Sequence, residues 1–96
     1  MILTTTSNIE GKKITKYLGI ITGLATIGPG ATMFEPSKKV RKEALHEMEI
    51  EAKQLGANAV VGINLDLYHK VVDHYKTINA FEVLMVSVSG TAVIIE

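Results

Sequence analysis

Residues 58–69 show the clearest alternation of apolar and polar positions, directly after a charged segment that ends at Gly56. Successive residues of a strand lie on opposite faces of a sheet, so the alternation predicts a strand with one apolar face. The apolar face comprises Ala59, Val61, Ile63, Leu65 and Leu67. The other face comprises Asn58, Val60, Gly62, Asn64, Asp66 and Tyr68. We expect the apolar face to lie under a helix.

An earlier strand is predicted over residues 13–27, which are rich in Ile and Thr and contain Gly19 and Gly23. Both of its faces are apolar. One comprises Ile14, Leu18, Ile20 and Leu24, and the other comprises Tyr17, Ile21, Ala25 and Ile27. A strand of this kind is expected to be covered on both sides.

A helix is predicted from Ser37 to Leu55, with Ser37 as its N-cap and Gly56 in the left-handed position after its end. The apolar stripe expected to lie on the sheet comprises Val40, Ala44, Leu45, Met48, Ala52 and Leu55. Ile50 falls on the polar side, as an ordinary exposed residue or as a subunit contact. Glu51 falls at the edge of the stripe.

The charges of this helix oppose its dipole, at a cost of only about 0.3–1 kcal/mol each. The early turns hold Lys38, Lys39, Arg41 and Lys42, and the later turns hold Glu43, Glu47, Glu49 and Glu51. One interpretation is a solvated face with the pairs Lys39–Glu43 and Glu49–Lys53. The other is that basic turns meet acidic turns of a neighbouring subunit in a ring, which predicts salt-sensitive assembly.

The last strand is predicted from Phe81 to Val88, with apolar and small polar positions alternating. Gly90 is expected to bend or bulge it before a closing edge segment, residues 92–95. The order β-α-β-β with one long helix predicts an α+β fold. Four polar residues should then share a sheet face that the helix leaves uncovered and that could line a cavity in a closed oligomer: Asn64, Asp66, Ser87 and Ser89.

The 96 residues fit a single domain, 1–96, whose thin core and 47% hydrophobic content favour a homo-oligomer. Ten basic and ten acidic residues cancel, which argues against nucleic acid or an anionic membrane as a partner. No apolar stretch approaches the about 18 residues of a membrane span. The chain has no cysteine, which fits a reducing compartment, so we expect a cytoplasmic protein.

Without thiolates, a transition-metal site would depend on imidazole and carboxylate ligands. The candidates are His69, Asp73 and His74, with Asp66 nearby in the sequence. On a regular strand His69 and His74 would point to opposite faces, so a turn or a symmetry-related copy would have to bring them together. The alternative is a pair of solvated histidines in a hairpin. His46 lies on the polar side of the predicted helix.

The alternatives to a metal site are a homo-oligomeric ring with a purely structural role and a ring that binds a small molecule. A ring of subunits could bury a planar ligand such as a flavin among Tyr17, Tyr68, Tyr75 and the polar sheet face. Catalysis is not expected, because neither Ser87 nor Ser89 has a recognisable His-acid pair to activate it. Both serines are explained as small strand residues.

The glycines and small apolar residues of the chain resemble the YbjQ-like family, small bacterial and archaeal proteins commonly described as heavy-metal-binding. The matching positions are Thr4, Thr5, residues 11–23 with Ile14, Tyr17, Gly19, Thr22 and Gly23, residues 55–62, Asp66 and residues 85–93. The resemblance implies a dodecin-like β-α-β-β subunit with an antiparallel sheet packed on one long helix, assembled into a homopentameric ring. It also implies a divalent transition metal as ligand, although these positions do not form a coordination set.

Overall fold

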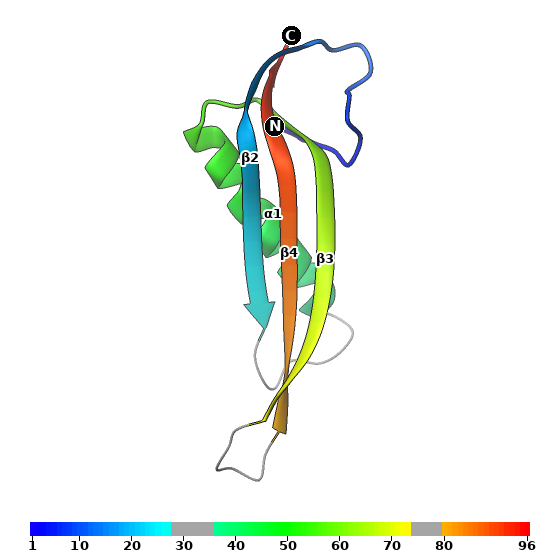
Figure 1. Ribbon diagram of the computed structural model, residues 1–96, viewed down its shortest axis with the longest axis vertical. Helices are drawn as coiled ribbons and strands as arrows, with labels where there is room; N and C mark the ends of the chain where they lie inside the picture. Colours follow the sequence, from blue (N-terminus) through cyan, green and yellow to red (C-terminus); the bar gives the residue numbers. More distant parts are fainter. Residues whose placement is uncertain (28–35, 74–79) are drawn as a thin grey trace.

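One helix packs on a four-stranded sheet in the computed structural model, which describes residues 1–27, 36–73 and 80–96 (Figure 1). The elements are β1 (Ile2–Leu3), β2 (Ile14–Ile27), α1 (Pro36–Gln54), β3 (Ala59–Asp73) and β4 (Ala80–Ile95). The predicted α+β class and the β-α-β-β order of the main elements are confirmed. The short β1 was not predicted, and its parallel pairing with β3 makes the sheet mixed rather than antiparallel.

The last strand lies in the centre of the sheet, whose order is β1-β3-β4-β2. β4 pairs antiparallel with β2 along one side and with β3 along the other. The expectation that residues 92–95 form an edge was therefore wrong, because Val93 pairs with both Tyr17 and Ala59. β4 also runs through Gly90 as one strand. A Cβ at Gly90 would lie 2.7 Å from Cγ1 of Val60, so close packing requires glycine there.

The helix ends as predicted and starts one residue early. Gly56 has a φ of 83°, and its N–H donates to the carbonyl of Lys53 at 3.0 Å. The Ala57 N–H donates to the Ala52 carbonyl at 3.0 Å, which completes the Schellman end of a helix. Because α1 begins at Pro36, Ser37 lies within its first turn and is not the N-cap. Proline is well suited to the first helical position, where its missing N–H would have no partner in the helix.

Register shifts in β3 and β2 correct the predicted strand faces. The register between β3 and β4 shifts between Val61 and Asn64, where Gly62 has a φ of 61°. A bulge adds one residue and reverses the alternation, so Val60 lies on the helix side with Ile63, whereas Val61 lies on the other side. In β2 the register shifts between Tyr17 and Gly19, where Gly19 has a φ of 137°, and this reverses the predicted faces of Tyr17 and Leu18. A further shift between Ile14 and Lys16 returns Ile14 to the side predicted for it.

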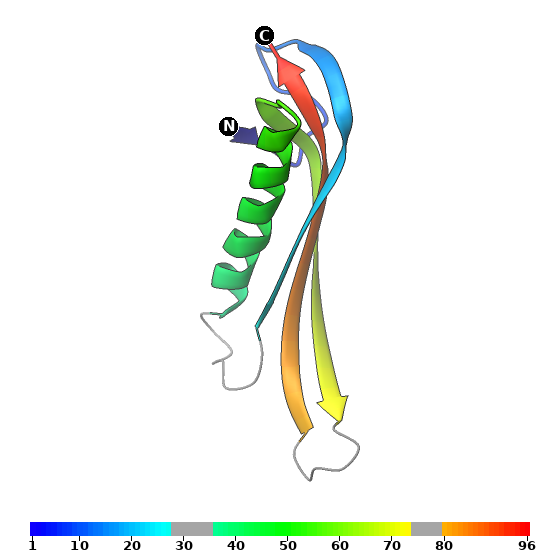
Figure 2. The same cartoon turned by 90° about the vertical axis from the view of Figure 1, so that its left-hand side faces the viewer.

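The main core lies between α1 and the covered face of the sheet, as Figure 2 shows from the side. α1 contributes four fully buried residues at four-residue spacing, namely Val40, Ala44, Met48 and Ala52. The sheet contributes Ile21, Ala25, Val60, Ile63, Val86, Val88 and Ala92. The helix backbone approaches β2 so closely at Gly23 that an added Cβ would collide with the carbonyl oxygen of Ala44. Small residues therefore set the distance between helix and sheet.

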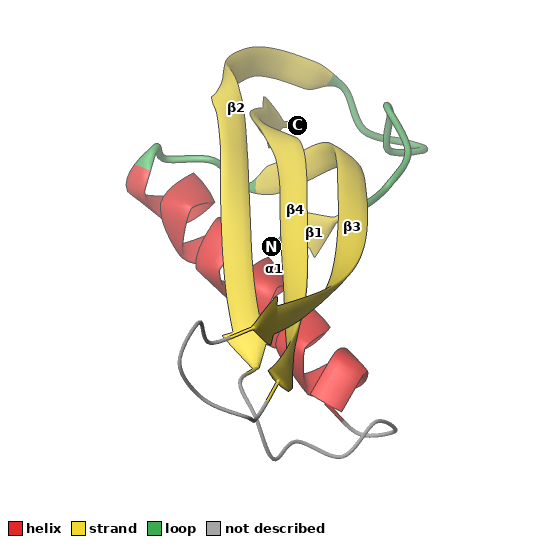
Figure 3. Ribbon diagram, turned by 60° about the horizontal axis from the view of Figure 1, so that its bottom comes forward, coloured by secondary structure: helices red, strands yellow, loops and turns green. Residues whose placement is uncertain are grey.

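A second, smaller core lies on the opposite face at one end of the sheet. It contains Ala59, Val61, Val93 and Ile95, with Ile9 and Ile14 packed against them. The segment that follows β1 is held across this end by backbone bonds, including Gly62 N–H to Thr6 at 2.8 Å. Beyond this end, the described residues leave the second face of the sheet uncovered (Figure 3).

The chain is elongated, with principal extents of 56 × 23 × 16 Å. Its radius of gyration is 16.4 Å, whereas a compact domain of this length has about 12.5 Å. β3 and β4 project beyond the helix and β2 (Figure 2). The helix in the described part of the chain is not long and apolar enough to cross a membrane.

Candidate functional site

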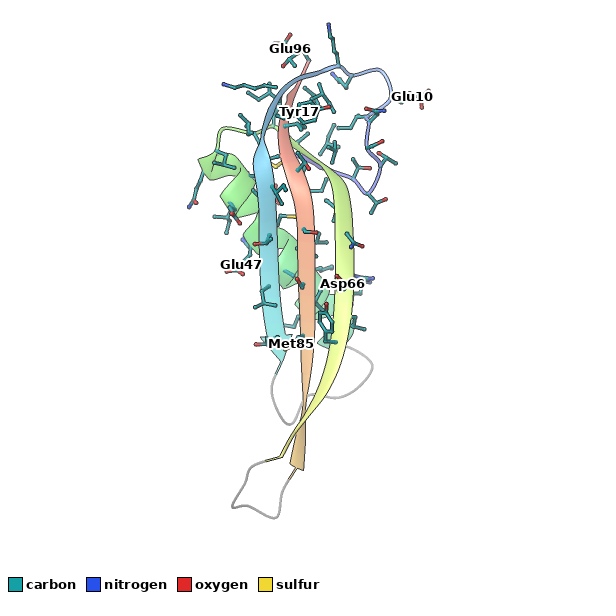
Figure 4. All side chains as sticks on the ribbon, viewed as in Figure 1. Glu10, Tyr17, Glu47, Asp66, Met85 and Glu96 are labelled. Carbon is teal, nitrogen blue, oxygen red and sulfur yellow. The ribbon has the colours of Figure 1, made fainter. Side chains whose placement is uncertain are left out.

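The face of the sheet that α1 does not cover is the candidate site, and we call it the open face. Residues that pair across neighbouring strands share a face, so the registers of β2, β3 and β4 define it. It comprises Ile20, Thr22, Leu24 and Thr26 of β2, Met85, Ser87, Ser89 and Thr91 of β4, and Asn64, Asp66 and Tyr68 of β3. In Figure 4 the labelled residues Asp66 and Met85 lie on β3 and β4.

The middle of the open face carries two polar rows. Thr22, Ser89 and Asn64 form one row, because Ser89 pairs with both of its neighbours. Leu24, Ser87 and Asp66 form the next row in the same way. The prediction that Asn64, Asp66, Ser87 and Ser89 share a face that the helix leaves uncovered is therefore confirmed. These hydroxyl, amide and carboxylate groups can hydrogen-bond water or a polar ligand.

Exposed apolar side chains lie beside the polar residues of these rows and beyond them. Ile20 is 81% exposed and Leu24 is 51% exposed, both on β2. Tyr68 on β3 is 52% exposed. The expectation that β2 is covered on both sides is thus not met within the described residues of a single chain. By the strand registers Ile20 and Tyr68 lie at opposite ends of the open face with Leu24 between them, so the exposed apolar side chains are spread along it.

The tyrosines considered for a planar ligand do not meet on the open face. Tyr17 pairs with Val93 and Tyr68 pairs with Met85. Eight residues of β4 separate those partners, which is about 27 Å at the usual rise of a strand. Tyr75 lies outside the described residues. One subunit therefore gives no stacking site formed by Tyr17 and Tyr68 together.

The structure places the candidate metal ligands only in part. His69 and Asp73 belong to β3, where they pair with Leu84 and Ala80, and their side chains and the whole of His74 lie outside the described residues. Four residues of strand separate His69 from Asp73 by about 13 Å along the backbone. A site that uses both would therefore need ligands from another segment or another copy. The described side chains contain no group of three metal-binding residues.

The helix presents a different surface. His46 is exposed, and Ile50 is 43% exposed. The predicted Glu49–Lys53 pair is present at 3.7 Å, with the glutamate partly buried, whereas Lys39 and Glu43, both in the described helix, are not paired.

Glu51 has a contact that the sequence did not suggest. One of its carboxylate oxygens accepts the backbone N–H of Thr22 at 3.4 Å. β2 lies at the edge of the sheet, so this contact occupies an otherwise free edge donor. The position of Glu51 beside the apolar stripe was the only signal of it.

Asn58 is a second residue that the sequence did not single out. Its side-chain Nδ2 donates to the carbonyl of Ile95 at 3.0 Å, and its Oδ1 accepts the Ile95 N–H at 2.8 Å. The amide thereby imitates a strand neighbour at the end of β4. This role is structural and lies next to the second core.

A comparison with protein families matches residues 1–35 and 28–96 to the YbjQ family, whose description is "Putative heavy-metal-binding". Among solved structures, the chain is similar to a crystal structure of a protein of unknown function from Pediococcus pentosaceus, assigned to the DUF74 family. The two superpose with a TM-score of 0.73 at 18% identity, over 100% of this chain and 98% of the other. At that identity the likeness concerns the fold.

Proposed function

The chain belongs to the YbjQ family, and from this premise we propose that it is a non-catalytic binding protein that works as a homo-oligomeric ring. In its full form the proposal is a dodecin-like homopentamer in the cytoplasm. A heavy metal is the ligand class that the family description suggests.

The exposed surface of the subunit is the observation that carries the ring. The chain exposes 6719 Å², whereas a compact monomer of this mass exposes about 5,400 Å². The excess of about 1,300 Å² exceeds the about 800 Å² that each partner buries in a standard interface. Three exposed large apolar side chains, Ile20, Leu24 and Tyr68, lie on the open face, so association of copies there would give this small chain additional buried area.

Native mass spectrometry at micromolar concentration tests the ring. A mass five times that of the 10.4 kDa chain is expected. A single oligomer with a different number of copies would support a ring and reject the pentamer. A monomer would contradict the proposal.

Metal binding is the specific form of the binding role. His69, Asp73 and His74 are its proposed ligands, and a ring would bring equivalent residues of several copies around one axis. Imidazole and carboxylate ligands suit zinc, copper and nickel. The metal would cross-link subunits if it took ligands from more than one copy.

Isothermal titration calorimetry with zinc, copper and nickel tests the proposed metal binding. Saturable binding is expected. The affinity should fall at least tenfold in a His69→Ala/His74→Ala variant, because loss of a residue that only hydrogen-bonds a metal ligand already lowers metal affinity about tenfold or more. His46→Ala is the matched control, because His46 is exposed on the helix. Equal binding by the double variant would reject these ligands. Absence of binding by the unaltered protein would leave a purely structural ring.

A further inference from the structure

We propose that the outer edge of β2 in one copy pairs in parallel with the outer edge of β3 in the next copy, head to tail. The acidic side of α1 would lie along this joint. The inference rests on the proposed homo-oligomer and specifies the surfaces that build it.

Beyond Thr22, the outer edge of β2 has backbone groups with which no described strand pairs. The Thr22 N–H points away from β4, because it donates to the Glu51 carboxylate. Backbone groups alternate along a strand, so Leu24 and Thr26 also present their N–H and carbonyl groups outward. Within the described residues no strand pairs with this edge. An unpaired edge of this length is a template for another strand.

The outer edge of β3 is free over a matching stretch. β1 pairs with β3 only at Ala59 and Val60. The Ile63 N–H points to the same side, since it donates to the Thr4 carbonyl at 3.1 Å. By the same alternation Leu65 and Leu67 present their backbone groups outward, and the described chain supplies no strand beside them.

The directions of the strands select the geometry of pairing. β2 and β3 both run antiparallel to β4, so they are parallel to each other. Rotation about an axis along the strands keeps their directions, and β2 would then meet β3 of the next copy in parallel. A twofold joint would instead pair β2 with itself in antiparallel fashion.

The charges on α1 favour the head-to-tail joint. The side of the helix above the β2 edge carries three exposed glutamates at four-residue spacing, namely Glu43, Glu47 and Glu51. Figure 4 shows Glu47 beyond the β2 edge of the sheet. The opposite side of the helix carries Arg41, Glu49 and Lys53, and Lys53 is paired with Glu49 at 3.7 Å, so Arg41 supplies the positive charge there that no described carboxylate pairs. A twofold joint through β2 would place two acidic rows side by side. A head-to-tail joint places the acidic row of one copy toward Arg41 of the next.

The position of the helix leaves part of the apolar side of β3 uncovered, and the joint would cover it. α1 lies mainly over β2 and β4, away from β3. Leu67, on the helix side of β3, is therefore 52% exposed. In the joint, α1 of the neighbouring copy would lie next to β3 and cover Leu67. The two long edges and this side chain supply contact area that the isolated subunit leaves in water.

Leu24→Pro tests the backbone pairing. Proline removes an N–H that the β2–β4 ladder does not use, so the subunit should still fold, as edge strands accept proline. We expect the ring to dissociate to monomers in native mass spectrometry and sedimentation velocity. Leu24→Ala is the control, because it shortens the same side chain and keeps the N–H. It should weaken the ring much less than Leu24→Pro does, and circular dichroism should show a folded chain in both.

Charge reversal tests the orientation without changing the strands. Arg41→Glu should raise the dissociation constant about tenfold, because it places a glutamate against the acidic row of the neighbour. Lys42→Glu makes the same change of charge at the adjacent residue, which points away from the sheet, and should change it less than about twofold. Adding Glu47→Lys to Arg41→Glu should restore association.

The outcomes separate this joint from the ring itself. A monomeric unaltered protein would contradict the ring and the joint together. A ring that survives Leu24→Pro would reject edge pairing and leave the ring in place. Should Leu24→Pro fail to fold, the charge variants decide: equal effects of Arg41→Glu and Lys42→Glu, or no rescue by Glu47→Lys, would reject the head-to-tail joint.

Discussion

The two faces of the sheet are built from alternate residues of the same strands, yet they meet opposite requirements. On β4, Val86 and Val88 are fully buried under the helix, whereas Ser87 and Ser89, which alternate with them, lie on the open face and are only partly buried. The covered face is packed so closely that Gly23 and Gly90 leave no room for a side chain. The open face has small polar rows and exposed apolar groups instead.

The covered face stabilises the fold of the chain, whereas the open face is available for contacts with other molecules. Asp66 is the only charged residue of the open face as defined above, while the exposed sides of α1 carry many charges. Depletion of charge together with exposed aliphatic and aromatic groups is typical of the centre of an interface. Substitutions on the covered face should therefore lower the free energy of unfolding. Substitutions on the open face should instead weaken the association of copies.

The helix allows the largest test of this comparison. Met48 is fully buried against the sheet, and Ile50, two residues later, is 43% exposed. Met48→Ala should lower the free energy of unfolding by about 3 kcal/mol, through lost burial and the cavity left behind. Ile50→Ala should lower it by less than about 1 kcal/mol. Urea denaturation at one fixed protein concentration measures both, since assembly makes stability depend on concentration. Similar losses in the two variants would remove the distinction between the buried and exposed sides of α1.

Gly23→Ala tests how tightly helix and sheet approach each other. The new methyl would collide with the Ala44 carbonyl oxygen and would lie 3.0 Å from Cγ2 of Val88. Backbone cannot move aside as a side chain can, so we expect a loss of about 2 kcal/mol in the free energy of unfolding. Ser87→Ala, a small change on the open face, should cost less than about 0.5 kcal/mol. The same denaturation experiment compares them, and a harmless Gly23→Ala would mean that the helix can shift away from β2.

The sequence predicted those parts of the fold that depend on local signals. The end of α1 at Gly56 follows from a glycine placed directly after an apolar stripe, which fixes the local hydrogen bonds. The faces of β3 were predicted correctly after Gly62 and wrongly before it. Glycine marks a place where a bulge can form, but whether one forms depends on the register with β4, which is not a local property. The central place of β4 is likewise set by pairing between distant segments.

The candidate site shows the same division. Asn64, Asp66, Ser87 and Ser89 were placed together correctly, since the register has no shift from Asn64 onward along β3. The contact of Glu51 with the edge of β2 could not be predicted, because it depends on how the helix crosses the sheet. The metal site of His69, Asp73 and His74 stays a prediction, as its side chains lie outside the described residues.

The smallest expected effect concerns the end where the open face is closed by the second core. Asn58 binds both backbone groups of Ile95 there, in partly buried surroundings. Asn58→Ala should cost about 1–2 kcal/mol in the free energy of unfolding, because it leaves the backbone N–H and carbonyl of Ile95 without these partners. Asn58→Asp keeps the acceptor for the N–H and places a second carboxylate oxygen against the carbonyl, so it should not restore the loss.

Asn64→Ala is the control for this last prediction. Asn64 lies on the open face, and none of the described side-chain hydrogen bonds involves it. Its replacement should change the free energy of unfolding by less than about 0.5 kcal/mol. Amide hydrogen exchange at Ile95 gives an independent measurement, because its N–H should exchange faster in Asn58→Ala and at an unchanged rate in Asn64→Ala. Equal exchange in the two variants would show that the amide of Asn58 does not hold the end of β4, since only one of them lacks it.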